Sequence, residues 1–234
     1  MKNKILLKDR RGSHVGVIAS FTIFILFLVG IYLATQPLLK TEKDREVLLE
    51  SLWVETTNLL SNEMTTVVIN SSGTANCTRV NYSLVGQLGE IGIGIAKDIN
   101  GVQLKTGYSS QSLDINLTGT IENILWAYYS KEFSPPGTVC SGAVEWAQIK
   151  SIRNGNYVFE KRVLSAINNF ESFKGNLSIP QENKMEMEFT LANGTPVKTT
   201  ISEIDRDVFV KERKVQYVNG NATILYGKLK IILF

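Results

Sequence analysis

The longest apolar stretch of the chain lies near its start and predicts a membrane-spanning helix. Between Ser13 and Leu39, 27 residues follow one another without a lysine, arginine, aspartate or glutamate. The segment from Val15 to Ala34 is 20 residues long and would extend roughly 30 Å as a helix, which matches the hydrocarbon thickness of a bilayer. We therefore expect residues 13–39 to form a transmembrane helix.

The next segment combines apolar and charged positions at a helical period. Its apolar residues recur at spacings of three, four and seven, so they share one broad stripe, and charged residues occupy much of the remaining surface. This pattern predicts that residues 40–64 form an amphipathic stalk helix that continues the transmembrane helix. The stripe consists of Val47, Leu48, Leu49, Leu52, Trp53, Leu59 and Leu60.

From residue 65 onward, short apolar or alternating runs are separated by Gly, Asn, Ser and Pro, which predicts β-strands. Asn100-Gly101 and Asn219-Gly220-Asn221 are expected to connect two hairpins. Met185, Met187 and Phe189 alternate with polar residues, as in a half-buried strand. Further strands are expected over residues 66–69, 91–96, 102–106, 113–117, 121–129 and 143–149.

One helix is expected to interrupt this β-rich region. Apolar residues share one face of the segment 158–174, and Gly175 is well placed to end it. The predicted fold class is therefore α+β: a long N-terminal transmembrane and stalk helix, then a mostly antiparallel β head domain with one amphipathic helix. No linker divides residues 65–234, which are enough for one compact domain. The apolar face comprises Phe159, Val163, Ala166, Ile167, Phe170 and Phe173.

The first 12 residues form a basic leader that predicts the orientation in the membrane. Their only acid is Asp9, and an excess of basic residues holds a flanking segment in the cytoplasm. We therefore expect a single-pass protein of the cell membrane with a cytoplasmic N-terminus and an extracytoplasmic C-terminal domain beyond Lys40. The basic residues are Lys2, Lys4, Lys8, Arg10 and Arg11.

Hydropathy distinguishes two kinds of N-terminal signal, a cleaved secretory signal and an uncleaved signal anchor. A cleaved secretory signal has an apolar region of about 7–15 residues, so this run is too long, and Tyr32-Leu33-Ala34 matches a cleavage site poorly. An uncleaved signal anchor fits the pattern fully.

A third interpretation comes from Arg10-Arg11-Gly12, which is followed by Ser13 and the apolar helix. This arrangement resembles the class III signal of archaeal type IV pilins and archaellins. The resemblance implies that a prepilin peptidase reads Arg10 and Arg11 and cuts after Gly12. It also implies that the apolar helix stays on the mature protein and bundles with the helices of like subunits in a filament core. The implied partners are the lipid bilayer, the peptidase and related pilin subunits.

The apolar helix carries further features that fit this resemblance. Small residues that let helices approach closely in lipid are present, and Pro37 lies where pilins often carry a helix-softening proline. One position departs from the pattern, since Val17 stands where many pilins have a glutamate. The small residues are Gly16, Ala19, Ser20 and Gly30.

Acceptor patterns for N-glycosylation, Asn-x-Ser/Thr, occur seven times, all beyond the apolar run. This distribution agrees with an extracytoplasmic location, although β-domain loops are in general rich in these residue types. Asn193 is the weakest of the seven because Pro196 follows its Thr195. The sequons begin at Asn70, Asn76, Asn81, Asn116, Asn176, Asn193 and Asn221.

The two cysteines, Cys77 and Cys140, both lie beyond the apolar run. In an oxidising compartment such a pair favours a disulfide, and two reduced, buried thiols are the alternative.

Catalytic and metal-binding patterns are not found. The only histidine is His14 at the membrane edge, so the predicted ectodomain has none for a Ser-His-Asp or Cys-His arrangement or for zinc. The glycines between Gly89 and Gly94 lack the basic residue and helix of a phosphate-binding loop. The acids Glu122, Glu132 and Glu145 are scattered. We therefore predict that the protein is not an enzyme and binds no cofactor. The formal net charge of +3 does not indicate nucleic acid binding.

The resemblance implies a type IV pilin-like surface subunit, in particular a minor pilin or pseudopilin, and the other features agree with a surface location. A glycosylated head would provide adhesive or structural contacts. The alternative is an uncleaved, single-pass surface or envelope protein with a binding ectodomain.

Overall fold

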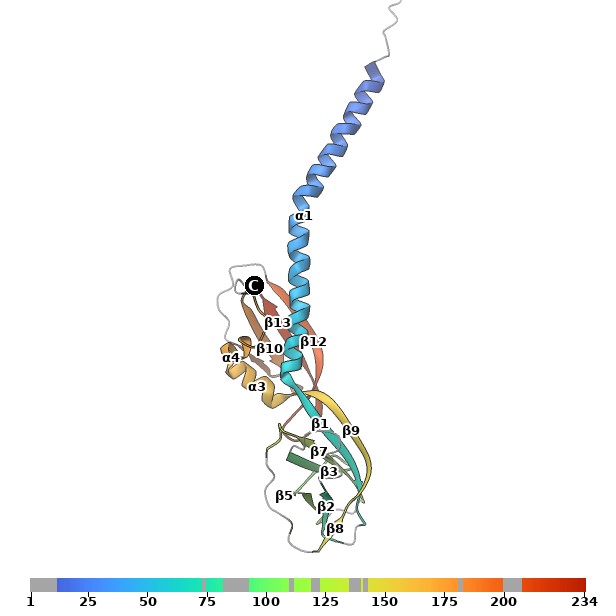
Figure 1. The fold of residues 1–234 in the computed structure, drawn as a ribbon, viewed down its shortest axis with the longest axis vertical. Helices are drawn as coiled ribbons and strands as arrows, with labels where there is room; N and C mark the ends of the chain where they lie inside the picture. Colours follow the sequence, from blue (N-terminus) through green and yellow to red (C-terminus); the bar gives the residue numbers. More distant parts are fainter. Residues whose placement is uncertain are drawn as a thin grey trace, which may run out of the picture. The chain divides into compact units, whose positions relative to one another are not determined.

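The computed structural model describes residues 12–72, 75–81, 93–109, 112–118, 123–134, 140, 143–180, 183–199 and 208–234. The chain forms two compact units, Met1–Leu48 and Leu49–Phe234, which are described separately below. One long helix followed by a mostly β domain with short helices gives an α+β fold, as the sequence predicts (Figure 1).

Helix α1, Gly12–Leu60, passes directly into strand β1, Ser61–Asn70. The predicted stalk ended at residue 64, whereas the helix stops four residues earlier. The β-branched run from Thr65 to Ile69 explains the change, because such side chains pack well on a pleated strand and lose rotamer freedom in a helix.

Unit Leu49–Phe234 contains a nine-stranded sheet in the order β11-β10-β13-β12-β9-β1-β7-β3-β4 and a four-stranded sheet in the order β5-β6-β2-β8. Strand β1 lies between β7 and β9 and is antiparallel to both. Strands β12 and β9 are parallel and joined by only two residue pairs. The other strands are β2 Cys77–Asn81, β3 Ile93–Asp98, β4 Gln103–Leu104, β5 Thr106–Ser109, β6 Ser112–Asn116, β7 Ile124–Ser130, β8 Val144–Trp146, β9 Gln148–Phe159, β10 Met185–Thr190, β11 Pro196–Lys198, β12 Phe209–Val218 and β13 Ile224–Leu233.

Both predicted hairpin connections are confirmed. Asn100-Gly101 joins β3 to β4, with Gly101 at a φ of 80°, in the left-handed region that favours glycine. The β12–β13 hairpin turns over residues 219–223, where Ala222, with a φ of 54°, takes the left-handed conformation.

The predicted single amphipathic helix is wrong in its extent. Its segment begins as the end of β9, continues as α3, Glu160–Asn168, and resumes as α4, Phe170–Lys174. The break falls at Asn169, with φ −119° and ψ 46°, where two consecutive asparagines are poor helix formers. Val163, Ala166 and Ile167 are buried as expected, but no residue of α4 is.

Two sheets enclose the first part of the core. Val67, Ile69 and Leu125 of the large sheet pack with Leu113 and Ile115 of the small sheet. A second cluster contains Met64, Ile95, Phe133, Phe159, Val218 and Ala222.

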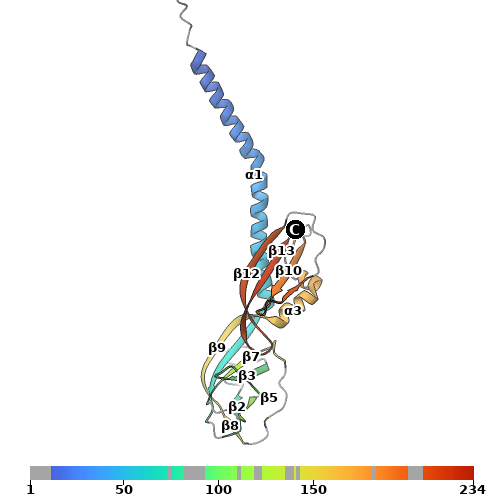
Figure 2. The ribbon, with the colours of Figure 1, turned by 180° about the vertical axis from the view of Figure 1, so that it is seen from behind.

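The last turns of α1 cover one face of β10, β13 and β12 (Figures 1 and 2). Cross-strand pairs point to the same side of a sheet, so Lys211 and Arg213 share a face with Ile231 and Leu229. Glu50 of α1 pairs with both basic residues, which places the helix over this face. The buried residues here include Leu49, Leu52, Trp53, Met185, Met187, Phe189, Leu229, Ile231 and Leu233.

Candidate functional site

The predicted processing site lies at the start of α1. Arg10 and Arg11 fall outside the described residues, while Gly12 is the first residue of the helix and Ser13 the second. The proposed cut after Gly12 therefore falls within the first turn of the described helix.

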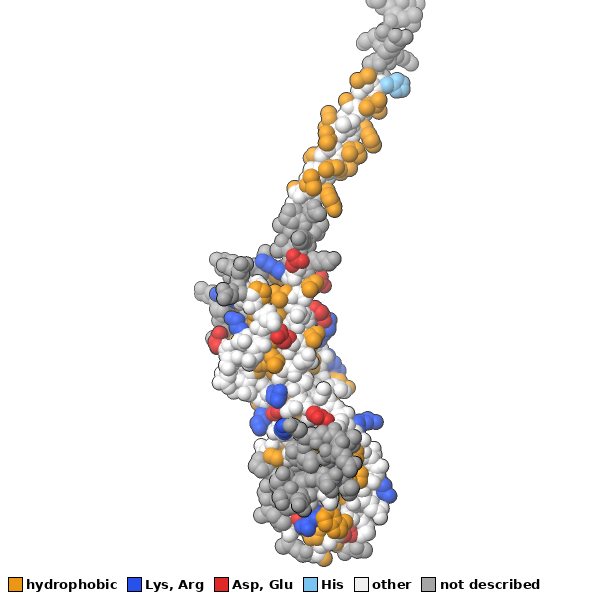
Figure 3. Space-filling view, viewed as in Figure 1, with side chains coloured by type: hydrophobic (Ala, Val, Ile, Leu, Met, Phe, Trp, Pro, Cys, Tyr) orange, Lys and Arg blue, Asp and Glu red, His pale blue; other side chains and the backbone are white. Residues whose placement is uncertain are grey.

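The apolar segment is long enough to cross a membrane by length and composition. It comprises His14–Thr35, 22 residues, and its side chains are exposed in the structure. Figure 3 shows hydrophobic side chains along this part of the helix. The hydroxyls of Thr22 and Thr35 donate to the carbonyls of Ile18 and Ile31, at 2.9 and 3.0 Å, so neither needs water.

The small residues predicted to pack against other helices lie on one side of this segment. At 100° per residue, Gly16, Ala19, Ser20 and Gly30 fall within about 100° of one another. A Cβ atom added to either glycine would meet nothing within 4 Å. Pro37 lies within α1 and has no backbone N–H to donate to the preceding turn. This side of the helix is open to close approach.

The opposite end of α1 is held by polar contacts inside unit Leu49–Phe234. Glu50 pairs with Lys211 and Arg213, and the guanidinium of Arg213 lies 5.6 Å from the ring centroid of Trp53. Glu55 accepts hydrogen bonds from the backbone N–H and the hydroxyl of Ser178, at 3.1 and 3.2 Å. Of the predicted stripe, Leu49, Leu52, Trp53 and Leu60 are buried.

Arg162 of α3 connects the end of α1 to the sheet. Its Nη1 donates to the carbonyls of Leu59 and Ser61, at 3.0 and 3.1 Å, and its Nε donates to Glu132 Oε1 at 2.7 Å. Helix carbonyls of the last turn lack partners within the helix, so a cation there is stabilising.

Glu132 is the acidic centre of this junction. Asn62 Nδ2 also donates to its Oε1, at 2.8 Å. Burial raises the pKa of Glu132, but the hydrogen bonds from Arg162 and Asn62 and the charges of Arg162 and Lys161 outweigh it and lower that pKa below its ordinary value of 4.5. Glu132 is therefore held ionised at neutral pH.

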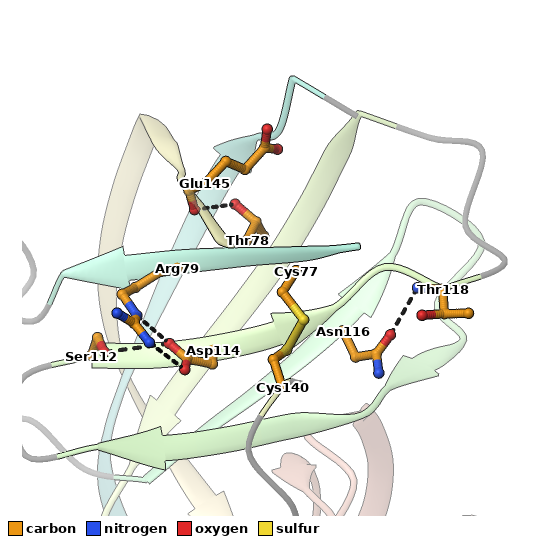
Figure 4. Close-up of a disulfide and its surroundings, with 9 residues drawn as sticks. All are labelled: Cys77, Thr78, Arg79, Ser112, Asp114, Asn116, Thr118, Cys140 and Glu145. Atoms are coloured by element: carbon orange, nitrogen blue, oxygen red, sulfur yellow. Dashed lines mark hydrogen bonds and ion pairs between the residues drawn. A yellow bond between two sulfur atoms is a disulfide. The ribbon is translucent and has the colours of Figure 1, made fainter. Parts of the chain in front are cut away.

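Cys77 and Cys140 form a disulfide, as the sequence favoured (Figure 4). The Cα atoms are 6.1 Å apart, and 63 positions separate the two residues. Closing a loop of this length stabilises the fold by about 4 kcal/mol on the chain-entropy model.

An ion pair lies beside this disulfide on the small sheet. Arg79 donates to both carboxylate oxygens of Asp114, at 2.6 and 2.8 Å (Figure 4). This hydrogen bonding raises the pKa of Arg79 against the opposing effect of burial. The guanidinium also lies 5.7 Å from the ring centroid of Trp146, which is exposed.

The predicted glycosylation residues are distributed over the head domain. Asn76, Asn176, Asn193 and Asn221 are exposed, and Asn70, Asn81 and Asn116 are half-buried. Two residues of the Asn81 sequon lie outside the described residues.

Two of the three acids that are scattered along the sequence, Glu132 and Glu145, are described, and both have partners within the domain. Glu132 pairs with Arg162, and Glu145 accepts hydrogen bonds from the hydroxyls of Ser71 and Ser72. Glu122 lies outside the described residues. Within the described part of the chain, no group of three or more His, Cys, Asp or Glu could hold a metal ion.

The glycine-rich stretch has a packing role where it is described. A Cβ atom on Gly94 would lie 2.8 Å from Leu113 Cδ2 and 2.9 Å from Tyr129 Cε1. Gly94 therefore lets β3 approach the small sheet.

Sequence reasoning did not identify Arg162 or Lys97. Lys97 Nζ is buried and donates to Thr223 Oγ1 at 2.8 Å and to the Ala222 carbonyl at 3.2 Å, and burial lowers its pKa. Both hydrogen bonds of Lys97 join residues more than 120 positions apart, so no local sequence pattern could have revealed these contacts.

Comparison of the chain with models of protein families, with curated proteins and with solved structures gives no match. Its function has to be inferred from its own residues.

Proposed function

We propose that this chain is a type IV pilin-like subunit of a cell surface, in particular a minor pilin or pseudopilin. Its N-terminus is cytoplasmic, a prepilin peptidase removes residues 1–12, and the β domain lies outside the cell. The apolar helix then anchors the protein in the membrane or bundles with helices of like subunits in a filament.

The observation that carries this proposal is the continuity of α1. A single helix begins at Gly12, exposes an apolar segment of 22 residues, and ends in the core of a β domain. An anchor that only tethers a domain can be joined to it by a flexible linker. Here the helix that carries the apolar segment also contributes Leu52 and Leu60 to the core of the head.

The start of the helix supports cleavage after Gly12. Helix α1 begins at Gly12, the residue after which the cut is proposed, and its first turn contains no acidic residue. Removal of the leader would leave the mature chain beginning with the helix itself. The N-terminal turn would then be free to enter a helical bundle.

The open side of the apolar segment supports bundling. Helices associate in lipid through close van der Waals packing, which small residues permit. The exposed positions of Gly16 and Gly30, where an added Cβ meets nothing, leave room for a neighbouring helix. Pro37 would allow the helix to bend as subunits pack.

The head domain supports an extracytoplasmic location. It contains a disulfide, which persists in oxidising compartments, and exposed asparagines of four sequons, where attached glycans would face solvent. Its exposed sheet face carries pairs of opposite charge, such as Lys228–Glu212 at 3.0 Å. These features suit a surface that provides adhesive or structural contacts.

The cleavage site is tested by the substitution Gly12→Leu. Because a branched side chain at this position would not fit a peptidase that reads Arg-Arg-Gly, the variant should remain in the membrane as an uncut precursor. The wild-type chain should be shorter by its 12 leader residues. Gly16→Leu is a matched control, since it makes the same change outside the motif and should still be cut.

Immunoblotting and mass spectrometry of membranes from cells that make a prepilin peptidase distinguish the two forms. Normal processing of Gly12→Leu would refute the assigned site. An uncut wild-type chain would instead favour the single-pass surface protein that never polymerises.

A further inference from the structure

Folding affects the seven glycosylation sequons unequally. Six of them have all three residues within the described ranges, and in five of these the central residue is buried, with exposures between 1% and 7%. In Asn193-Gly194-Thr195 all three residues are exposed. The buried central residues are Ser71, Cys77, Leu117, Leu177 and Ala222.

The cause of this burial is the position of the sequons at strand ends and packed turns. Successive side chains of a strand point to opposite sides, so an asparagine facing solvent places the next residue in the core. Leu117, for example, follows the last residue of β6 and joins the core between the two sheets. Ala222 belongs to the second core cluster, and the hydroxyl of Thr223 accepts a hydrogen bond from Lys97.

We call the five sequons with a buried central residue the closed sequons. The sequon at Asn76 is the most deeply buried of them. Its central residue, Cys77, forms the disulfide with Cys140, and its hydroxyl residue, Thr78, is fully buried. The Thr78 hydroxyl lies 3.5 Å from the Glu145 carbonyl (Figure 4). The asparagine side chain is exposed, but the remainder of its sequon is built into the fold.

Asn193 has different surroundings, in the tight turn between β10 and β11. Gly194 has a φ of 83°, its N–H donates to the Leu191 carbonyl at 2.9 Å, and a Cβ atom added to it would meet nothing within 4 Å. The Asn193 side-chain oxygen accepts a hydrogen bond from the Thr195 N–H at 3.0 Å, which leaves its amide nitrogen directed away from this bond. The turn projects all three residues into open space.

We propose that, among the six described sequons, Asn193 is the glycan acceptor of the folded head domain, and that the five closed sequons are acceptors only while the chain is unfolded. This inference rests on the proposed export of the domain. A glycosyltransferase has to bind the whole acceptor tripeptide, so a buried central residue requires local opening of the core, whereas the Asn193 turn requires none.

The reaction is a transfer from a lipid-phosphate-linked oligosaccharide. The Asn193 Nδ2 attacks the anomeric carbon of the sugar, and a nitrogen–carbon bond forms. The bond between that carbon and the phosphate oxygen breaks, the lipid phosphate leaves, and the amide nitrogen loses one proton to a base of the transferase. No electrons are gained or lost.

The test uses the full-length, unglycosylated protein in detergent micelles, with an oligosaccharyltransferase and a lipid-phosphate-linked oligosaccharide. One sample is folded with the disulfide closed, and the other is reduced, alkylated and diluted from denaturant immediately before the assay. Mass spectrometry of peptides measures the rate of modification at each sequon. In the folded sample we expect Asn193 to be modified at least tenfold faster than the five closed sequons. In the unfolded sample this difference should fall to a few fold.

Two substitutions act as matched controls. Asn193→Gln should abolish modification at the six described sequons of the folded chain and leave the other sites of the unfolded chain unchanged, while Asn176→Gln should not affect the folded chain. Modification of folded protein at Asn76 or Asn221 as fast as at Asn193 would overturn the proposal, and so would a folded chain unmodified at Asn193. The assay needs neither cleavage after Gly12 nor filament assembly, so its outcome is independent of the processing test.

Discussion

The two ends of helix α1 have the same backbone conformation and opposite surroundings. Leu26, in the apolar segment, is 65% exposed, whereas Leu52, in the last turns, is 1% exposed. The apolar segment has apolar side chains on all sides and no described side-chain contact outside the helix, whereas the last turns have one apolar stripe that the sheet covers. A helix that is apolar all round requires an apolar environment from outside the chain, and an amphipathic one is satisfied by its own domain. The comparison therefore separates the part of α1 that the head needs for folding from the part available to lipid or other subunits.

The largest expected effect comes from truncating one leucine in each part. Leu52→Ala should lower the free energy of unfolding of the head by about 2–5 kcal/mol, because it leaves a cavity in a packed core. Leu26→Ala should change it by less than about 0.5 kcal/mol. Denaturant unfolding of the full chain in detergent, followed by tryptophan fluorescence, measures both. Equal losses would show that the comparison is wrong.

The next effect concerns the junction at the end of α1. Arg162→Met should destabilise the head by about 2–3 kcal/mol, because it leaves the Glu132 carboxylate and the carbonyls of Leu59 and Ser61 without a cation. This loss of stability is smaller than the loss expected when a fully buried ion pair is broken, since the Arg162 side chain is 38% exposed. Lys161→Met, at the neighbouring position of α3, also removes a charge near Glu132 but should have a smaller effect, because Lys161 Nζ donates to the Glu132 backbone carbonyl at a long 3.4 Å. If the two variants unfold at the same denaturant concentration, Arg162 does not hold this junction.

Two glycines, one in each part of the molecule, should tolerate an added methyl group very differently. Gly94→Ala should cost about 1–3 kcal/mol, because its Cβ would lie within 3.0 Å of Leu113 and Tyr129 side-chain atoms. Gly30→Ala should leave the unfolding of the head unchanged, since nothing lies within 4 Å. Thermal unfolding monitored by circular dichroism distinguishes these outcomes. Destabilisation of the head by Gly30→Ala would mean that the apolar segment has contacts within the chain.

The smallest effect is pH-dependent. Glu132→Gln should lower stability by about 1–2 kcal/mol at pH 7, because it removes a charge that accepts hydrogen bonds from Arg162 and Asn62. Because the pKa of Glu132 is lowered in the folded state, its carboxylate contributes fully to the free energy of unfolding above about pH 4.5. This contribution is lost as the pH falls through the folded-state pKa. The difference between wild type and variant should shrink over that range in urea titrations at several pH values. A difference independent of pH would contradict this role.

Local patterns in the sequence predicted the elements that depend on neighbouring residues. The Asn100-Gly101 turn follows from the left-handed conformation that glycine allows, and the burial of Leu49, Leu52 and Trp53 follows from helical spacing. Strand β9 was predicted only at its start, because its middle reads Ser-Ile-Arg-Asn-Gly-Asn and its side chains are mostly exposed. Pairing with β1, about 90 positions earlier, forms this strand.

The candidate site also contains features that are visible in the sequence and contacts that depend on the tertiary fold. The apolar run and the Arg-Arg-Gly motif are contiguous, so they can be identified from sequence alone. The contacts of Arg162 with Leu59 and Ser61 join residues 103 and 101 positions apart, and no spacing rule detects them. The accessibility of the sequons also depends on tertiary packing: among the six described sequons, Asn193, the weakest by sequence because of Pro196, is the one that the fold leaves open.

Prepilin processing would make Ser13, in the first turn of α1, the first residue of the mature protein. Mass spectrometry of the intact chain recovered from native membranes determines its first residue directly. A chain that starts at Ser13 is the result that the proposal predicts, and isolation of filaments would follow. A chain that starts at Met1 would contradict prepilin processing and would identify α1 as an uncleaved anchor for the head domain.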